Sequence, residues 1–276
     1  MMKTFRMSAF VGALLLAQAA HAQDAKQIVQ QAVNDQLAAD RSDTSHWRYV
    51  VTESDHSKFV VVETENGAMR RHIDVAGQPA SPQVLAQDDA DNQHFIHDSS
   101  LRAKQRQNSA HDDKSSIELL NLMPEAFLWT VESQTPELTT LSYKPNPNFN
   151  PPDMESRVMG NMSGTLVVTN PRHRIKTFKG RLVSDVTIGF GLLARIKAGS
   201  TFDIERSEVA PGYWQITQTH VHIGGHALFF KTIGTQEDSV KSDFTAVPHG
   251  TTLEQGLEML KEPASCCGGG SATRRR

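Results

Sequence analysis

The chain has 276 residues, and its 28 lysines and arginines against 31 acidic residues give a formal net charge of −3. This balance excludes the global basic field that attracts nucleic acid, so we expect no nucleic-acid partner. The only two cysteines, Cys266 and Cys267, are adjacent near the C-terminus. We therefore expect a domain that folds without disulfides.

The first 22 residues have the pattern of an export signal. Lys3 and Arg6 precede an apolar run at residues 9–17, and Ala-His-Ala at residues 20–22 supplies an A-x-A cleavage pattern. The run is shorter than the roughly 18 apolar residues that a membrane helix needs, and no later segment reaches that length. We expect cleavage after Ala22 and a periplasmic or secreted protein with no membrane span.

An amphipathic helix is predicted over residues 24–39, where apolar residues recur at helical spacing. These are Ile28, Val29, Ala32, Val33 and Leu37. The hydrophobic period then changes to two in HWRYVVTES and KFVVVETENGAMRRHIDVAGQP. These stretches predict three antiparallel strands, the last two joined by a hairpin turn at Asn66-Gly67.

The segment from Ser81 to Met123 is polar and rich in helix formers. It predicts two helices joined near residues 108–113 and stopped by Pro124, and its narrow apolar face is suited to docking on a sheet. We treat residues 83–122 as a helical insertion. Its acidic pairs, Asp88-Asp89 and Asp112-Asp113, are typical of a solvated surface.

After Pro124 the pattern is β almost to the end. The predicted strands are AFLWTVES, LTTLSYKP, SGTLVVTN, RIKTFKGRLVSD, GSTFDIERSEV, YWQITQTHVHIG, ALFFKTIG and SVKSDFTAV. Short strands at this spacing predict a large antiparallel sheet, curled or closed. TTLEQGLEMLKEP predicts a final short helix. We expect a mainly β protein with helices (α+β class), one domain over residues 23–262 and a flexible tail at 263–276.

The sequence contains no G-x-S-x-G elbow, phosphate-binding loop, G-x-G-x-x-G or paired-cysteine metal knuckle. Three histidines, His220, His222 and His226, could gather around zinc because the first two share a strand face. His94 and His97 share a helix face in the same way. Solvated faces are the favoured interpretation of both sets, so we predict no metal site, no cofactor and no enzymatic activity.

One long stretch resembles a known group of proteins. LSYKPNPNFNPPDMESRVMGNMSGTLVVTNPRHRIKTFKGRLVSDVTIGFGLLARIKAGSTFDIE, with YWQITQTHVHIGGHALFFKT and SDFTAVP, resembles exported bacterial proteins similar to the outer-membrane lipoprotein-sorting (LolA/LolB-like) carriers. The resemblance implies a strongly curved, incomplete antiparallel barrel whose concave apolar face is covered by helices. In the carriers that cavity shelters acyl chains. The helical segment 83–122 is longer and more polar than a simple carrier lid.

The resemblance gives the apolar loop at residues 189–193 two interpretations. Its side chains either form a lip at the mouth of the half-barrel or plug the bottom of its core. As a lip, Phe190, Leu192 and Leu193 are the candidate ligand-binding residues, together with Trp214 and Phe230. Other strand aromatics either line a cavity or belong to an ordinary core; they are Trp47, Trp129, Phe178 and Phe202.

The leading functional hypothesis is a periplasmic, non-catalytic carrier that holds a lipid or a lipoprotein acyl chain in a half-barrel cavity. The alternative is an envelope scaffold with a filled core and a protein partner. A metal-dependent enzyme built on the strand histidines is the weaker alternative.

Overall fold

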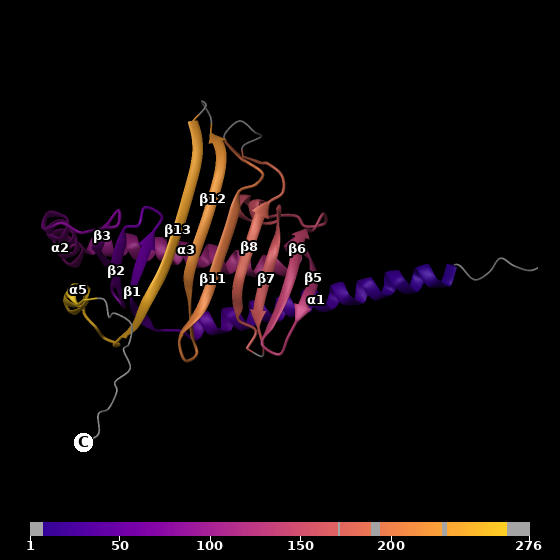
Figure 1. Ribbon diagram of the computed structural model, residues 1–276, viewed down its shortest axis with the longest axis horizontal. Coiled ribbons are helices and arrows are strands. Elements are labelled where there is room, and N and C mark those ends of the chain that lie inside the picture. The colour runs from indigo at the N-terminus through magenta and orange to yellow at the C-terminus, as the bar shows by residue number, and fades with distance from the viewer. Residues whose placement is uncertain (1–7, 171, 189–193, 228–230, 264–276) are drawn as a thin grey trace, which may run out of the picture. The chain divides into compact units, whose positions relative to one another are not determined.

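A computed structural model describes residues 8–170, 172–188, 194–227 and 231–263 (Figure 1). Side chains are described for these residues except at 8–23, 188, 194, 226–227 and 231–235. The described chain forms antiparallel strands and five helices, which confirms the α+β class, and its strands do not close into a complete barrel. In the same residues, no helix is both long enough and apolar enough to cross a membrane.

The chain divides into two compact units. Unit 1 comprises the described parts of Met1–Asp43, Asp113–Glu208 and Gly212–Glu237, and unit 2 those of Thr44–Asp112, Val209–Pro211 and Asp238–Arg276. Each unit has a hydrophobic cluster of its own. One domain over residues 23–262 therefore stays a prediction.

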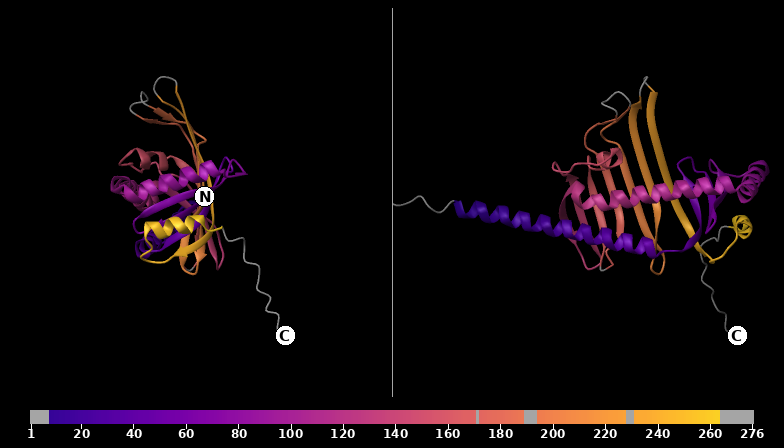
Figure 2. Two further views of the ribbon diagram at one scale, coloured as in Figure 1. Left: turned by 90° about the vertical axis from the view of Figure 1, so that its left-hand side faces the viewer. Right: turned by 180° about the vertical axis from the view of Figure 1, so that it is seen from behind.

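The sheet of unit 1 has the strand order β12-β11-β8-β7-β6-β5. Its strands are β5 (Phe127–Gln134), β6 (Leu138–Pro145), β7 (Met162–Thr169), β8 (Ile175–Leu182), β11 (Thr201–Ala210) and β12 (Tyr213–Ala227). Short β9 (Val186–Ile188) and β10 (Ala194–Ile196) pair with each other, and β10 also pairs with β12. In the edge-on view of Figure 2, this short ribbon bends out of the plane of the sheet.

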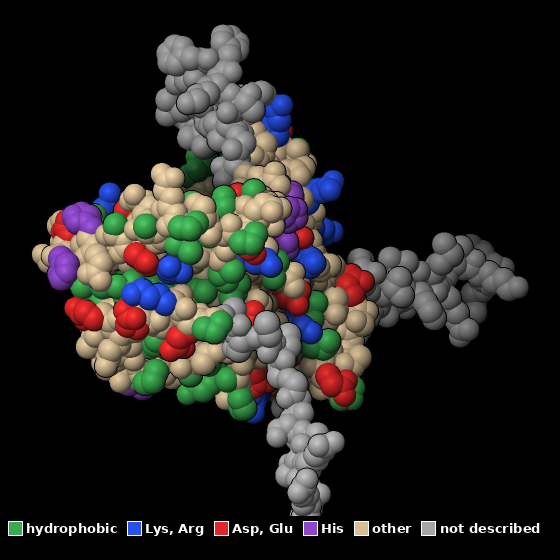
Figure 3. All heavy atoms as spheres, turned by 60° about the vertical axis from the view of Figure 1, so that its left-hand side comes forward, with side chains coloured by type: hydrophobic (Ala, Val, Ile, Leu, Met, Phe, Trp, Pro, Cys, Tyr) green, Lys and Arg blue, Asp and Glu red, His purple; other side chains and the backbone are tan. Residues whose placement is uncertain are grey.

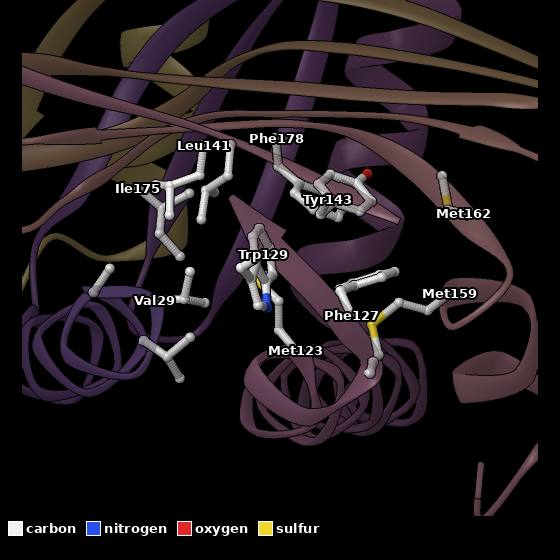
Figure 4. Packing of buried hydrophobic residues seen from close by; sticks show 14 of the residues in the cluster. Val29, Met123, Phe127, Trp129, Leu141, Tyr143, Met159, Met162, Ile175 and Phe178 are labelled. Carbon is white, nitrogen blue, oxygen red and sulfur yellow. The ribbon is translucent and has the colours of Figure 1, made fainter. Parts of the chain in front are cut away.

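Helices lie on one face of this sheet (Figure 2). They are α1 (Ser8–Ser42), the second half of α3 (Ser99–Ala126) and the short α4 (Met154–Met159). The predicted helix at 24–39 is confirmed within α1, and Val29, Ala32 and Val33 on its apolar stripe are fully buried. Figure 4 shows Val29 of α1 and Met123 of α3 on the same side of the sheet as Trp129.

Unit 2 has the strand order β4-β3-β2-β1-β13. Its elements are β1 (His46–Glu53), β2 (Lys58–Thr64), β3 (Gly67–Val75), β4 (Gln78–Pro79), α2 (Pro82–His97) and α5 (Leu253–Lys261), while β13 (Lys231–Val247) begins in unit 1 and ends in unit 2. The three predicted strands and the final helix are confirmed. The turn between β2 and β3 lies at residues 65–66, one residue before the predicted position. Gly67 instead opens β3 at a φ of 139°, where an added Cβ would collide with Phe95 and Gln105.

The predicted joint between the two central helices was wrong. The chain breaks at Asp98 rather than near residues 108–113, because Asp98 caps α3: its Oδ1 accepts hydrogen bonds from the backbone N–H groups of Ser100 (2.8 Å) and Leu101 (3.2 Å). Residues 108–113 continue as helix. Pro124 does not stop α3, which runs two residues further and leads directly into β5.

Candidate functional site: an aromatic row in unit 1

Five aromatic rings form a continuous row across the sheet of unit 1. Phe127 and Trp129 come from β5, Tyr143 from β6, Phe178 from β8 and Phe202 from β11. Adjacent ring centroids lie 5.2 Å apart for Trp129 and Tyr143, 5.1 Å for Tyr143 and Phe178, and 6.1 Å for Phe178 and Phe202. These separations are in the range of favourable aromatic pairs.

Strand register places the rings on one face. Trp129 lies opposite Tyr143 in the β5–β6 pair. In the β8–β11 pair, Phe178 lies opposite Ile204, which is two positions from Phe202 on the same strand. Since side chains at every second position of a strand share a face, Phe202 lies on the helix-covered face with the rest of the row. Figure 4 shows four of the rings together above α3.

Gly180 makes room for the Tyr143 hydroxyl, and Gly164 allows the close approach of the β8 backbone at Lys179. Gly164 of β7 lies opposite Gly180 of β8, and an added Cβ at Gly180 would collide with the Tyr143 hydroxyl. The Tyr143 side chain reaches across β7 to β8, where its hydroxyl donates a hydrogen bond to the carbonyl oxygen of Lys179 at 3.0 Å. Its ring stacks on Phe178 with an interplanar angle of 9°.

The one titratable group in the row is unsuited to proton transfer near neutral pH. Burial raises the pKa of the Tyr143 phenol well above its ordinary value, and the negative charge of Asp203 raises this pKa further. The phenol therefore stays neutral and acts as a fixed donor. The row is an apolar surface rather than an acid–base constellation.

The cover over the row ends at its β11 edge. Trp129 and Tyr143 are each 3% exposed and share a core with residues of α1 and α3. Phe178 is 9% exposed, whereas Phe202 is 36% exposed. The row thus runs from the core to an apolar side chain in contact with solvent.

Polar contacts join β11 to the end of α1. Arg206 of β11 donates from Nη2 to Asp40 Oδ1 of α1 at 3.0 Å, and Gln36 Nε2 donates to the same oxygen at 2.8 Å. Gln36 is only 1% exposed, and its Oε1 has no donor in the described part of the chain. Arg206 Nε is likewise unpartnered there. The last turns of α1 are thus attached by polar contacts, while its earlier turns are attached by apolar packing.

Of the predicted ligand-binding residues, the structure describes only Trp214, and ligand binding by the set stays a prediction. Trp214 is a half-buried residue of β12; its carbonyl accepts a hydrogen bond from Arg206 Nη2 at 3.4 Å, and its buried indole N–H has no acceptor among the described residues. Phe190, Leu192, Leu193 and Phe230 lie outside the described residues, so the choice between lip and plug stays open. Of the other candidates, Trp129 and Phe178 belong to the core of unit 1, and Trp47 to unit 2.

The histidines do not form a described metal centre. His220 and His222 lie on β12, and the side chain of His226 is outside the described set, so the zinc alternative for these three histidines is not tested. Within the part of the chain that the structure describes, no three His, Cys, Asp or Glu side chains gather closely enough to hold a metal. His94 Nε2 lies 3.8 Å from Asp98, whose carboxylate caps α3.

The acidic pair at residues 88–89 is not the solvated surface that the sequence predicted. Asp88 Oδ2 accepts from the backbone N–H of His72 and lies 2.8 Å from its Nδ1. Asp89 Oδ1 lies 2.8 Å from Arg71 Nε. Both carboxylates therefore attach α2 to β3, and the adjacent charges on β3 were the signal available in the sequence. On the face shown in Figure 3, acidic, basic and apolar side chains are mixed.

Two open pockets are formed by described residues of unit 1. One, of about 290 Å³, lies between α4 and β9 and is lined by Phe149, Arg157 and Asp185, among others. The other, of about 580 Å³, lies between the β10–β11 turn and β12. No protein-family model, no curated protein and no solved structure matches the chain.

Proposed function

We propose that the protein is an exported, non-catalytic binding or carrier protein for an apolar ligand, namely a lipid or a lipoprotein acyl chain. The observation that carries the proposal is the aromatic row, which leads from the core of unit 1 to the exposed ring of Phe202. An acyl chain lying on this edge would continue the apolar surface of the row. Such a site needs apolar walls and no reactive group.

The physical chemistry of the row suits a chain of methylenes. Burying a methylene stabilises a complex by about 0.8 kcal/mol, so roughly six methylenes laid against the row provide on the order of 5 kcal/mol before the entropic cost of binding. The neutral Tyr143 phenol adds no charge that would have to be desolvated. The pattern of residues 1–22 supports export, and the antiparallel sheet with helices on one face is compatible with the half-barrel that the sequence resemblance implies.

Titration of a fluorescent fatty acid into the purified full chain tests the proposal. We expect Phe202→Ser to weaken binding about tenfold, which corresponds to about 1.4 kcal/mol. Leu128→Ser is the matched control, because Leu128 is also an exposed apolar residue of the unit 1 sheet but alternates with the buried Phe127 and Trp129 and so faces away from the row. Wild-type affinity in the Phe202 variant, or no binding by the wild-type chain, would contradict the proposal.

A second candidate function is an envelope interaction module with a filled core. The full burial of Leu141, Leu166 and Val168 beneath the helices favours it, because those side chains occupy space that a carrier would leave for its ligand. Native mass spectrometry of the chain purified without detergent from the periplasm of its host distinguishes the two. A lipid mass removed by organic extraction supports the carrier. An unliganded mass that stays unchanged after incubation with lipids and lipopeptides supports the interaction module.

A further inference from the structure

The larger of the two pockets has a wall of fixed backbone. It has a volume of about 580 Å³ and is lined by residues that include Lys197, Gly199, Ser200, His222, Gly224 and Gln236. The backbone N–H of Lys197 donates to the carbonyl oxygen of Gly224 at 2.8 Å, and the N–H of Gly224 donates to Ser200 Oγ at 3.2 Å. These bonds fix the β10–β11 turn against β12.

Glycines keep the pocket open. An added Cβ at Gly199 or Gly224 would meet no other atom within 4 Å, so empty space lies over both. Gly199 also has a φ of 88°, a conformation that glycine adopts without strain. A volume of this size is within the range of small-molecule sites.

Among the described residues, the positive charge of one lysine at the pocket has no ion-pair partner. Lys197 is exposed and forms no ion pair within the described residues. The nearby acidic residue, Asp185, is already engaged: its carboxylate lies 3.6 Å from Arg195 Nη1 and accepts from the N–H of Ala198 at 2.8 Å. His222 and Gln236 are polar residues that also line the pocket.

We infer that this pocket binds a phosphate monoester, as the head group of an amphiphile whose chain lies on the aromatic row. Ser200 precedes Phe202 by two residues, about 7 Å along an extended chain. A ligand that binds its phosphate near Lys197 can therefore place its acyl chain against the exposed ring of Phe202. The position of the acyl chain rests on the proposed function, whereas phosphate binding itself requires only the pocket.

The pocket is tested first with glycerol 3-phosphate, which has no acyl chain. We expect saturable amide shifts in the NMR spectrum of the full chain at Gly199, Ser200 and Gly224. Lys197→Gln should abolish them, while Lys144→Gln, an exposed lysine of β6 outside the pocket, should leave them unchanged. The absence of saturable shifts in the wild-type chain, or equal shifts in the Lys197 variant, would overturn the inference.

Two amphiphiles with the same acyl chain identify the source of the phosphate. We expect lysophosphatidate to bind about tenfold more tightly than monoacylglycerol, and Lys197→Gln to remove this difference without weakening monoacylglycerol binding. Equal affinities, together with saturable glycerol 3-phosphate shifts, would assign the pocket to free phosphate esters and overturn the head-group assignment. If neither amphiphile binds, the proposed function fails, and the glycerol 3-phosphate shifts still decide the pocket.

Discussion

At the scale of single residues, two glycines determine how the aromatic row crosses the sheet. A tyrosine on β6 can contact a backbone carbonyl on β8 only if the intervening strand presents no side chain on that face. Gly164 leaves that position of β7 without a side chain, and Gly180 leaves space on β8 for the Tyr143 hydroxyl. The hydrogen bond from Tyr143 to the Lys179 carbonyl oxygen then satisfies a phenol that burial would otherwise leave without a partner.

We predict that Gly180→Ala destabilises the protein by about 1–3 kcal/mol, because the added methyl forces the Tyr143 ring out of its packed position. Gly224→Ala is the matched control: it also lies in a strand of unit 1, but its new Cβ would meet no other atom. Urea unfolding followed by far-ultraviolet circular dichroism measures both. Equal stability of the Gly180 variant and the wild-type chain would show that the glycine gap is not needed.

The sequence allowed some members of the row to be predicted and not others. Trp129, Phe178 and Phe202 are aromatic residues in strands with clear alternation, so they were candidates for either a cavity or a core. Tyr143 was missed, because its position depends on glycines in two other strands whose register the sequence does not state. The pairing of Asp88 with His72 was missed for a similar reason: it joins a helix to a strand across 16 residues.

At the scale of elements, the corner between α2 and α3 is held by hydrogen bonds to one half-buried carboxylate. The Ser100 hydroxyl and the backbone N–H groups of Ser100 and Leu101 all donate to Asp98 Oδ1. Arg102 meanwhile donates from Nη1 to the carbonyl oxygens of Phe95 and Ile96 at the end of α2. The residues at the start of α3 thus satisfy backbone groups of both helices, so α3 can begin directly after Asp98 without a longer loop.

The corner gives a pH prediction. The hydrogen bond from the Ser100 hydroxyl, followed by those from the backbone, lowers the pKa of Asp98 below its ordinary value of 3.8. Because the folded state favours the ionised carboxylate, the stabilisation is fully present above pH 3.8 and is lost as the pH falls through the lowered pKa. We expect hydrogen exchange at the Ser100 and Leu101 amides, corrected for intrinsic rates, to lose protection on acidification.

A matched pair of variants isolates this effect. Asp98→Ala should remove the acid-dependent part of the protection at Ser100 and Leu101. Asp91→Ala should leave it intact, because Asp91 is an exposed residue of α2 whose carboxylate accepts from Gln87 of the same helix and makes no other hydrogen bond within the described residues. The same loss of protection with pH in the Asp98 variant as in the wild-type chain would show that another group controls the corner.

Element boundaries were the weaker part of the sequence prediction. The apolar stripe of α1 and the alternation of β5, β6 and β7 were identifiable because burial imposes a strict period on them. The helix break at Asp98 was not, because the stretch at residues 108–113 contains more polar residues and yet propagates as helix. A single aspartate followed by a serine two residues later was the only local signal of the break.

At the scale of the whole molecule, the described residues form two hydrophobic clusters rather than one. The cluster of unit 1 gathers residues of α1, α3 and the strands from β5 to β9, whereas the cluster of unit 2 gathers β2, α5 and neighbouring residues. The sequence has no linker or change in composition that marks this division. The polar helical segment and the final strand each contribute residues to both units, so the division does not follow chain order.

The two clusters predict separate responses to core mutation. Leu141→Ala removes a fully buried side chain from unit 1, and Leu257→Ala removes a buried side chain from unit 2; each should cost about 2–5 kcal/mol. If the clusters unfold independently, hydrogen exchange will lose protection in β5–β8 alone for Leu141→Ala and in β1–β3 with α5 alone for Leu257→Ala. Loss of protection in both units for either variant would instead support one cooperative domain, because a single core transmits the cost of a cavity to every element that packs on it.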